Sequence, residues 1–332
     1  MYKLFASFFI LLLLAAPPGG CARAGAPAVG QEDGSLRIVC TIFPLYDWVR
    51  EILGDAADGV ELTLLLDNRI DLHNFQPSVD DMIRVSTCDL FVYVGGESDH
   101  WADDALKEAV NRDMIVLHLL DELGEAAKVE EIIEGMEAED EDGDDEDEDD
   151  YDEHVWLSLP NAKAFCIAIA DALSKLDPAR AGVYEDNLDA YTAKLSALDA
   201  EYRAAVGAAA EDTLLFGDRF PFRYLLDDYG LDYFAAFPGC SAETEASFDT
   251  IIFLARKMDE LDLRNVMVTE SADQSIARTI IGNTTKKDQQ ILVLDAMQSV
   301  TSSAVQAGLS YLSVMQNNLE ILKEALHGPT DL

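Results

Sequence analysis

The longest helical pattern in the sequence lies near the middle of the chain, at residues 177–209, and it constrains the fold more than any other feature. Apolar residues recur there at spacings of three and four, which is the period of one face of an α-helix. This stripe consists of Tyr184, Leu188, Tyr191, Leu195, Leu198, Tyr202 and Val206. At ~1.5 Å per residue the helix would be roughly 45 Å long, which exceeds the width of one small domain. We therefore predict a helix that links two lobes.

Short β-rich runs alternate with helical segments on both sides of this helix. Four runs precede it, at 37–43, 60–66, 89–95 and 114–120. Four more follow it, at 213–217, 232–237, 265–270 and 290–295. Buried strands that alternate with helices are typical of a parallel sheet with right-handed crossovers. We expect an α/β protein of two similar four-stranded lobes, 36–176 and 210–326, with a short tail at 327–332 and any ligand in the crevice between the lobes.

The N-terminus has the pattern of an export signal. Lys3 precedes an apolar run at 4–16, which is too short for a membrane-spanning helix, and small residues follow it. Cys21, after two glycines, is similar to the cleavage site of a bacterial lipoprotein. We therefore expect 1–21 to be a signal and a lipid on Cys21 to anchor the protein to the outer face of the cell membrane, with 22–35 as a flexible tether. Plain secretion is the alternative.

Acidic residues dominate the charge of the chain. The sequence has 64 Asp and Glu against 23 Lys and Arg, a formal net charge of −41 at pH 7. This balance excludes nucleic-acid binding, which needs basic side chains on the phosphates, and it attracts cations. Fourteen of the seventeen residues at 137–153 are acidic, a density typical of a disordered loop. That loop is either an inert solubilising insert or a weak, unselective collector of divalent cations.

Two of the five histidines lie where a metal ligand would be expected. His73 follows the predicted strand 60–66, and His154 lies between the acidic run and a predicted helix at 159–176. Imidazole nitrogens suit zinc and other borderline divalent ions, and carboxylates suit harder ions such as manganese. The pair therefore indicates a candidate metal site. No function is predicted for His100, His118 and His327.

The remaining cysteines give no metal or redox signature. Each of them lies in or beside an apolar segment, and no CxxC spacing is present. They are Cys40, Cys88, Cys166 and Cys240. We predict buried free thiols, and a disulfide between two of them stays an open alternative.

Four segments of the chain resemble motifs of one protein family. DLHNFQPSVDDMIRVSTCDLFVYVGG, around His73, resembles the first metal-histidine motif of the zinc- and manganese-binding proteins of ABC uptake transporters. DEHVWLSLPNAKAF, around His154, resembles the second motif. FGDRFPFRYLLDDYGLDYFAAF and VMVTESADQSIARTI resemble the third and fourth. The resemblance covers residues 36–326 and implies two α/β lobes joined by a long helix. Zinc-binding members carry a loop rich in histidine and acidic residues where this chain has 137–153.

The resemblance implies three ligands directly. His73 and His154 match the first two family histidines, and Glu270 matches the acidic ligand of the second lobe. The third family histidine falls on Arg219, whose guanidinium stays protonated and has no lone pair to offer a metal.

Three arrangements remain open at this position. Water completes a site of two histidines and Glu270, or Asp218 or Glu243 replaces the missing imidazole, or Arg219 pairs with Glu270 and weakens metal binding.

The resemblance implies a function outside the cytoplasm. The expected protein is a substrate-binding lipoprotein, not an enzyme, that captures a divalent transition metal and delivers it to the permease of an ABC importer. Zinc is favoured over manganese as the cargo. Protonation of the two histidines near pH 6 is expected to release the metal. Two alternatives stay open: a zinc-dependent hydrolase, although no HExxH motif is present, and a surface adhesin with a vestigial metal site.

Overall fold

The computed structural model describes residues 35–67, 70–137, 151–241 and 245–327. The predicted signal 1–21 with Cys21, the tether up to residue 34, the acidic residues 138–150 and Glu243 lie outside the described residues. The described part forms one compact unit that begins at Ser35. None of its helices combines the length and the apolar character needed to cross a bilayer.

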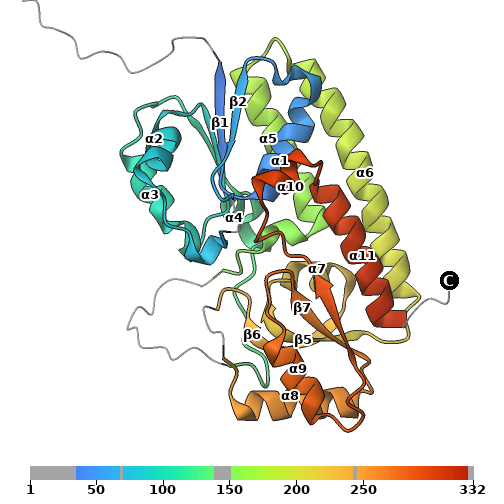
Figure 1. Ribbon diagram of the computed structural model, residues 1–332. Coiled ribbons are helices and arrows are strands. Elements are labelled where there is room, and N and C mark those ends of the chain that lie inside the picture. Colours follow the sequence, from blue (N-terminus) through green and yellow to red (C-terminus); the bar gives the residue numbers. More distant parts are fainter. Residues whose placement is uncertain (1–34, 68–69, 138–150, 242–244, 328–332) are drawn as a thin grey trace, which may run out of the picture. The chain divides into compact units, whose positions relative to one another are not determined.

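The first lobe is a four-stranded parallel sheet with helices on both faces (Figure 1). Its strands, in the spatial order β2-β1-β3-β4, are β1 (Leu36–Cys40), β2 (Val60–Leu64), β3 (Leu90–Tyr93) and β4 (Ile115–His118). Its helices are α1 (Phe43–Leu53), α2 (Val79–Thr87), α3 (His100–Lys107), α4 (Leu119–Leu123) and α5 (Leu159–Leu176). Strands β2, β3 and β4 lie inside the runs predicted from the sequence, and β1 begins one residue before its predicted run. The short helix α4 was not predicted.

The second lobe repeats this plan. Its parallel sheet has the order β6-β5-β7-β8, formed by β5 (Thr213–Phe220), β6 (Asp232–Pro238), β7 (Asn265–Thr269) and β8 (Gln290–Leu294). Its helices are α7 (Arg223–Tyr229), α8 (Phe248–Glu260), α9 (Ser275–Asn283) and α11 (Tyr311–His327), whereas α10 (Ser302–Gln306) lies beside α1 of the first lobe (Figure 1). The predicted α/β architecture of two four-stranded parallel lobes is confirmed.

The helix α6 (Ala181–Gly207) connects the two lobes. It packs against α1 and α5 of the first lobe and against α7 and α11 of the second. Its 27 residues span about 40 Å. The predicted start at residue 177 was wrong, because Asp177 closes α5 by donating its backbone N–H to Leu173 at 2.8 Å. The predicted apolar stripe is otherwise confirmed, with Leu188 and Val206 only partly buried.

One large apolar core runs through both lobes. It contains residues of the first sheet, of α5, α6 and α11, and of one face of the second sheet. A second, smaller core lies between the other face of the second sheet and helices α8 and α9. The lobes are therefore joined by packed side chains as well as by α6, which fixes the loops at the carboxyl ends of both sheets against each other.

Candidate metal centre

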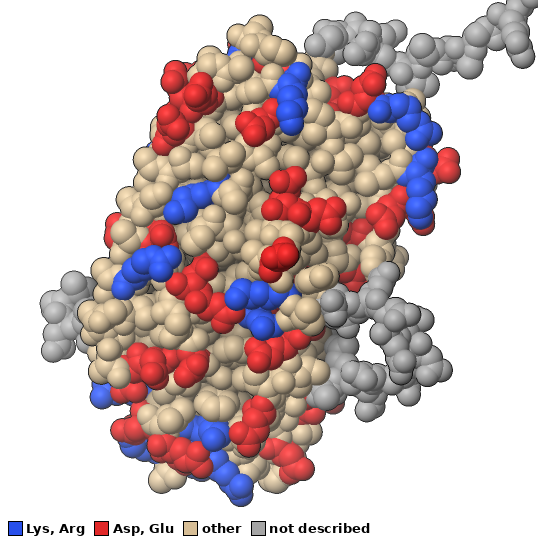
Figure 2. Space-filling view, turned by 180° about the vertical axis from the view of Figure 1, so that it is seen from behind, with Lys and Arg blue, Asp and Glu red and all other residues tan. Residues whose placement is uncertain are grey.

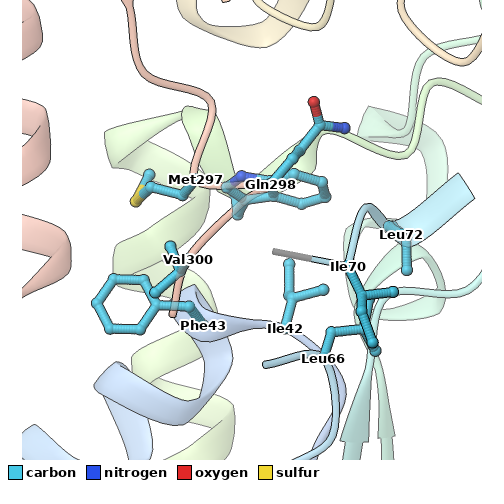
Figure 3. A pocket seen from close by; sticks show the side chains of 9 residues that line it. Ile42, Phe43, Leu66, Ile70, Leu72, Met297, Gln298 and Val300 are labelled. Atoms are coloured by element: carbon cyan, nitrogen blue, oxygen red, sulfur yellow. The ribbon is translucent and has the colours of Figure 1, made fainter. Parts of the chain in front are cut away.

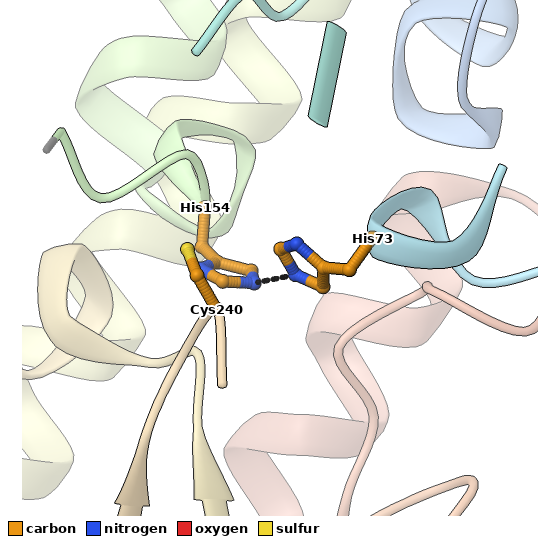
Figure 4. Close-up of side chains that lie close together, drawn as sticks. All are labelled: His73, His154 and Cys240. Carbon is orange, nitrogen blue, oxygen red and sulfur yellow. Dashed lines mark hydrogen bonds between the residues drawn. The ribbon is translucent and has the colours of Figure 1, made fainter. Parts of the chain in front are cut away.

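His73 and His154 meet where loops from the first lobe face the second. His73 lies in a 3-10 turn (Leu72–Asn74), and the Asp71 side chain caps that turn by accepting the His73 N–H at 3.1 Å. His154 precedes another 3-10 turn (Val155–Leu157) and is fully buried. The two Nε2 atoms lie 3.3 Å apart (Figure 4). The pair predicted from the sequence thus comes together.

Each imidazole is held through its other nitrogen. His154 Nδ1 lies 2.9 Å from Asp152 Oδ1, and since a carboxylate only accepts, this nitrogen carries a proton. In the neutral ring of this tautomer, Nε2 has the lone pair. His73 Nδ1 lies 2.8 Å from Ser98 Oγ and 3.5 Å from Glu153 Oε2. Proteins that bind metals through histidine orient the ring in this way, with a carboxylate or hydroxyl on the nitrogen remote from the metal.

Asp152 and Glu153 belong to the predicted acidic loop 137–153, and that prediction was wrong at the ends of the loop. Both side chains are buried, at 2% and 1% exposure. Glu153 also accepts the Ser98 N–H at 2.8 Å, and Glu137 donates its N–H to Ala236 at 3.0 Å. Side-chain and backbone hydrogen bonds thus order the two ends of the run, which propensity and charge density alone did not reveal.

Burial shifts the pKa values of two groups in opposite directions. Desolvation, assisted by the neighbouring His154, lowers the pKa of His73 to about 3, so this imidazole is neutral at physiological pH. Desolvation raises the pKa of Glu153 to about 7, because the charged carboxylate is disfavoured away from water. A neutral imidazole is the form that binds a metal ion.

Two residues of the second lobe approach the imidazole pair. The side-chain Nε2 of Gln298 lies 3.2 Å from His73 Nε2 and 3.0 Å from His154 Nε2. The Sγ of Cys240 belongs to a group of ligand atoms, with both histidines, that all lie within 4.8 Å of one another (Figure 4). The site is therefore surrounded by nitrogen, sulfur and amide groups from both lobes.

A small apolar cavity lies behind Gln298. Its volume of about 10 Å³ is close to the space of one water molecule. Apolar side chains from both lobes line it, among them Ile42, Leu72 and Met297 (Figure 3). The Gln298 amide points away from these side chains in Figure 3, so the polar end of the residue faces the histidines and the apolar surroundings keep water from its stem.

Comparison with known proteins assigns a family to this arrangement. The family model described as zinc-uptake complex component A, periplasmic, matches residues 38–325. The chain belongs to this family. Members of the zinc-uptake family are solute-binding proteins of metal transport rather than enzymes.

Named relatives agree with this assignment. The chain is 29% identical over 333 residues to the high-affinity zinc uptake system protein ZnuA of Bacillus subtilis, covering 98% of this chain and 99% of that protein. It is 29% identical over 297 residues to the zinc-binding lipoprotein AdcA of Streptococcus pneumoniae. The match to AdcA covers 89% of this chain but only 56% of the longer relative.

Solved structures share the two-lobed fold. The metal-dependent lipoprotein YcdH of Bacillus subtilis superimposes with a TM-score of 0.70 at 25% identity, over 88% of this chain and 99% of that one. The Zn(II)-bound ZnuA-like domain of Streptococcus pneumoniae AdcA gives a TM-score of 0.68 at 26% identity, over 88% and 99% of the two chains.

Arg219, the position at which the resemblance implies a third histidine, forms an ion pair between the lobes. The guanidinium lies 2.7 Å from Asp71 Oδ2, an ion pair between the second lobe and the turn that carries His73. Both side chains are mostly buried, at 15% and 17% exposure. Arg219 therefore pairs with Asp71, not with Glu270, and the ion pair holds the capping residue of the His73 turn in place.

The predicted acidic ligands of the second lobe contact other groups. Glu270 accepts the backbone N–H groups of Ala296, Gln298 and Ser299 at 2.8–3.1 Å. Asp218 accepts the Thr269 N–H at 3.0 Å. Neither joins the histidines in the ligand group found among the described residues. Their assignment as ligands stays a prediction.

Cys240 and Gln298 were not singled out by the sequence. Cys240 comes two residues after β6, and Gln298 follows β8, so both stand beyond the carboxyl ends of strands, where ligands bind in such sheets. Their position after predicted strands was the feature of the sequence that could have identified them. The four described cysteines are free, and Cys240 is the partly exposed one, whereas the other three are buried as predicted.

Acidic side chains are spread over the surface of the molecule. Figure 2 shows Asp and Glu spread over the whole face seen from behind, with fewer Lys and Arg between them. His118 lies outside the site and pairs with Asp121 at 2.8 Å, and His327 contacts the carbonyl of Ala205 at 3.0 Å. Neither of these two histidines contributes to the pair at the candidate metal centre.

Proposed function

We propose that this protein captures zinc outside the cytoplasm through His73 and His154 and delivers it to the permease of an ABC importer. The observation that carries the proposal is the 3.3 Å separation of the two Nε2 atoms. Zinc–nitrogen bonds of about 2.0–2.1 Å at a tetrahedral angle place two nitrogen ligands about 3.3 Å apart. The imidazole pair therefore has the spacing that one zinc ion requires.

The surroundings of the pair support capture without catalysis. His154 is fully buried, the His73 side chain is 7% exposed, and Asp152 and Ser98 lie within hydrogen-bonding distance of their remote nitrogens. A hydrolase needs an open coordination position beside a substrate pocket, and the cavity next to this site has room for about one water molecule. The family consists of metal-transport proteins, and neither the hydrolase nor the adhesin alternative is favoured.

The location and the anchor belong to the same proposal. A family described as periplasmic and a relative named as a lipoprotein support a place outside the cytoplasm. The sequence pattern before Cys21 supports a lipid anchor on this residue. Release of the protein from membranes by Cys21→Ser, with unchanged export, is the expected result of a fractionation experiment.

Calorimetric titration with zinc and with manganese tests the capture of metal. We expect tight zinc binding and weaker manganese binding by the full chain. The acidic run is tested by deleting 138–150 only, because Asp152 and Glu153 contact the two histidines. A solubilising insert predicts unchanged affinity after this deletion, and a cation collector predicts slower capture at low zinc. Absence of zinc binding in the full chain would refute the proposed function.

A further inference from the structure

The second lobe offers the histidine pair two groups, the thiol of Cys240 and the carboxamide of Gln298. They follow β6 and β8, the two edge strands of the second sheet. Three other candidates of this lobe contact other groups. Asp218 accepts from Thr269, Glu270 from the backbone of the loop after β8, and Arg219 pairs with Asp71.

The loop after β6 approaches His154 very closely. A Cβ at Gly239 would lie 3.0 Å from Cε1 and 3.1 Å from Nδ1 of His154, and 2.9 Å from the Phe220 carbonyl oxygen. Only glycine fits this contact without displacing the ring or the backbone. The N–H of the next residue, Cys240, donates to Glu130 Oε1 at 2.9 Å. These contacts place the thiol beside the imidazoles.

The distances are close to those of a zinc–thiolate site. A tetrahedral zinc with Zn–N of about 2.05 Å and Zn–S of about 2.3 Å separates nitrogen and sulfur ligands by about 3.6 Å. The thiol and imidazole ligand atoms already lie within 4.8 Å of one another. The 4.8 Å limit is longer than 3.6 Å, so the loop that carries Cys240 has to move toward the imidazoles for the sulfur to bind the same zinc ion.

Gln298 meets the geometry without any displacement. The Nε2 atoms of His73, His154 and Gln298 form a triangle with sides of 3.3, 3.2 and 3.0 Å. Nitrogen and oxygen ligands on one face of a zinc tetrahedron form a triangle with sides of about 3.3 Å. Half a turn about the last side-chain bond exchanges the amide NH₂ for the amide oxygen. The NH₂ donates to imidazole lone pairs, and the oxygen can face a cation.

We propose that Cys240, as a thiolate, and the amide oxygen of Gln298 complete a four-ligand zinc site with His73 and His154. This assignment rests on the proposed function and names the ligands of the same site. As the sulfur–zinc bond forms, the thiol proton leaves to water and no electron is transferred. Thiolate sulfur favours zinc, whereas manganese prefers oxygen ligands, so Cys240 is the residue that sets the preference for zinc. It supplies the donor that Arg219 cannot.

Titration with Co²⁺, used as a spectroscopic substitute for zinc, tests the thiolate ligand. We expect a near-ultraviolet thiolate-to-cobalt charge-transfer band in the unaltered protein and in the control Cys88→Ser, whose thiol is buried away from the site. Cys240→Ser is expected to lose the band. It should also lose zinc affinity by more than the roughly 10–100-fold that follows loss of an outer partner of a ligand. A band that persists in Cys240→Ser overturns the assignment.

A second measurement needs no variant. Zinc is expected to protect Cys240 from alkylation, measured peptide by peptide with mass spectrometry, and equal labelling with and without zinc would contradict the proposal.

Substitutions at Gln298 test the amide ligand. Gln298→Glu is expected to raise zinc affinity by adding a charged oxygen, and Gln298→Met to lower it. Zinc binding that survives all changes at Cys240 and Gln298 overturns this assignment but leaves the proposed function intact, whereas an unaltered chain that binds no zinc refutes both.

Discussion

The two lobes use their acidic residues at the site in opposite ways. In the first lobe, the carboxyl groups of Asp152 and Glu153 lie beside the remote nitrogens of the two imidazoles. In the second lobe, Asp218 and Glu270 accept backbone N–H groups and hold loops in shape. The first arrangement orients a metal ligand, and the second orients the backbone that presents one. A carboxylate at the end of a strand therefore has two possible roles, which its hydrogen-bond partners distinguish.

The largest effect is expected from removing the imidazoles themselves. His73→Ala combined with His154→Ala removes both imidazole ligands and should abolish measurable tight zinc binding. The reason is that the two Nε2 atoms lie 3.3 Å apart, the spacing of two ligands of one zinc ion. Zinc affinity is measured by calorimetry. Retained tight binding in the double variant would show that the site lies elsewhere, and His118→Ala serves as the control that should bind zinc normally.

A matched pair of substitutions tests the contrast between the lobes directly. Asp152→Asn weakens the orientation of His154 and should reduce zinc affinity about 10–100-fold, as expected when an outer partner of a ligating histidine is lost. Asp218→Asn removes a charge that contacts Thr269 and should leave zinc affinity nearly unchanged. Zinc affinity is measured by competition with a chelating dye. An equal loss of affinity in both variants would contradict the proposed difference between the roles of Asp152 and Asp218.

Glu270 distinguishes a loop-holding role from a ligand role. The two carboxylate oxygens of Glu270 accept three backbone N–H groups, and Glu270→Gln replaces one of these oxygens with an NH₂ group that cannot accept. We therefore expect a loss of about 1–3 kcal/mol in the free energy of unfolding. Zinc affinity should fall only as far as Gln298, which this loop carries, loses its position. Abolished zinc binding with unchanged stability, from denaturant titration and calorimetry, would instead make Glu270 a ligand.

The smallest effect concerns pH and a carboxyl of the first lobe away from the histidines. Burial raises the pKa of Asp99 to about 6, although the N–H groups of Val94 and Gly95 donate to it. The folded state therefore holds this proton more tightly than the unfolded chain, and the stabilisation is lost as pH rises through about 6. Between pH 5 and pH 7 the loss is about 1 kcal/mol.

Asp99→Asn, which resembles the protonated form, should remove that part of the pH dependence of stability.

His73 has the opposite effect on the pH dependence of stability. Its lowered pKa makes the folded state hold its proton less tightly, so stability falls as pH drops below about 6.5. Thermal denaturation in chelator at pH 5 and pH 7 measures both contributions. An identical pH dependence in Asp99→Asn would contradict the assignment.

The lowered pKa of His73 also changes the expectation for metal release. The sequence alone predicted release near pH 6, on the ordinary pKa of histidine. With a pKa of about 3, His73 stays neutral throughout the mildly acidic range. Release near pH 6 would therefore have to come from another ligand.

Much of the fold could be predicted from the sequence, because the apolar period changes sharply between strands and helices. The bounds of α5 agree with the prediction to the residue. The start of α6 was misplaced, because Pro178 suits a first helical turn and also suits the turn in which it lies. The pattern of residues predicts that a helix is present, but it does not show that the Asp177 N–H bonds to Leu173 and so ends the preceding helix at this position.

The site was only half predictable, for a reason of topology. His73 and His154 lie in recognisable motifs, whereas Cys240 and Gln298 follow strands at opposite edges of one sheet. Their approach to the same point depends on strand order, on the Glu270 contacts to the loop after β8 and on the fit of Gly239 against His154. None of these is encoded in the spacing of residues along the chain.

The position of Trp156 gives the protein an internal optical probe. Its indole ring lies 5.2 Å from the His154 ring, and its N–H donates to the Ala296 carbonyl of the other lobe at 2.9 Å. Trp48 and Trp101 pack instead against aromatic rings of Phe165 and Phe75. A quenching ion such as Cu²⁺ or Co²⁺ at His154 should therefore lower the fluorescence of Trp156 more than that of the other two tryptophans. Metal binding at the site can then be followed by intrinsic fluorescence without an added label.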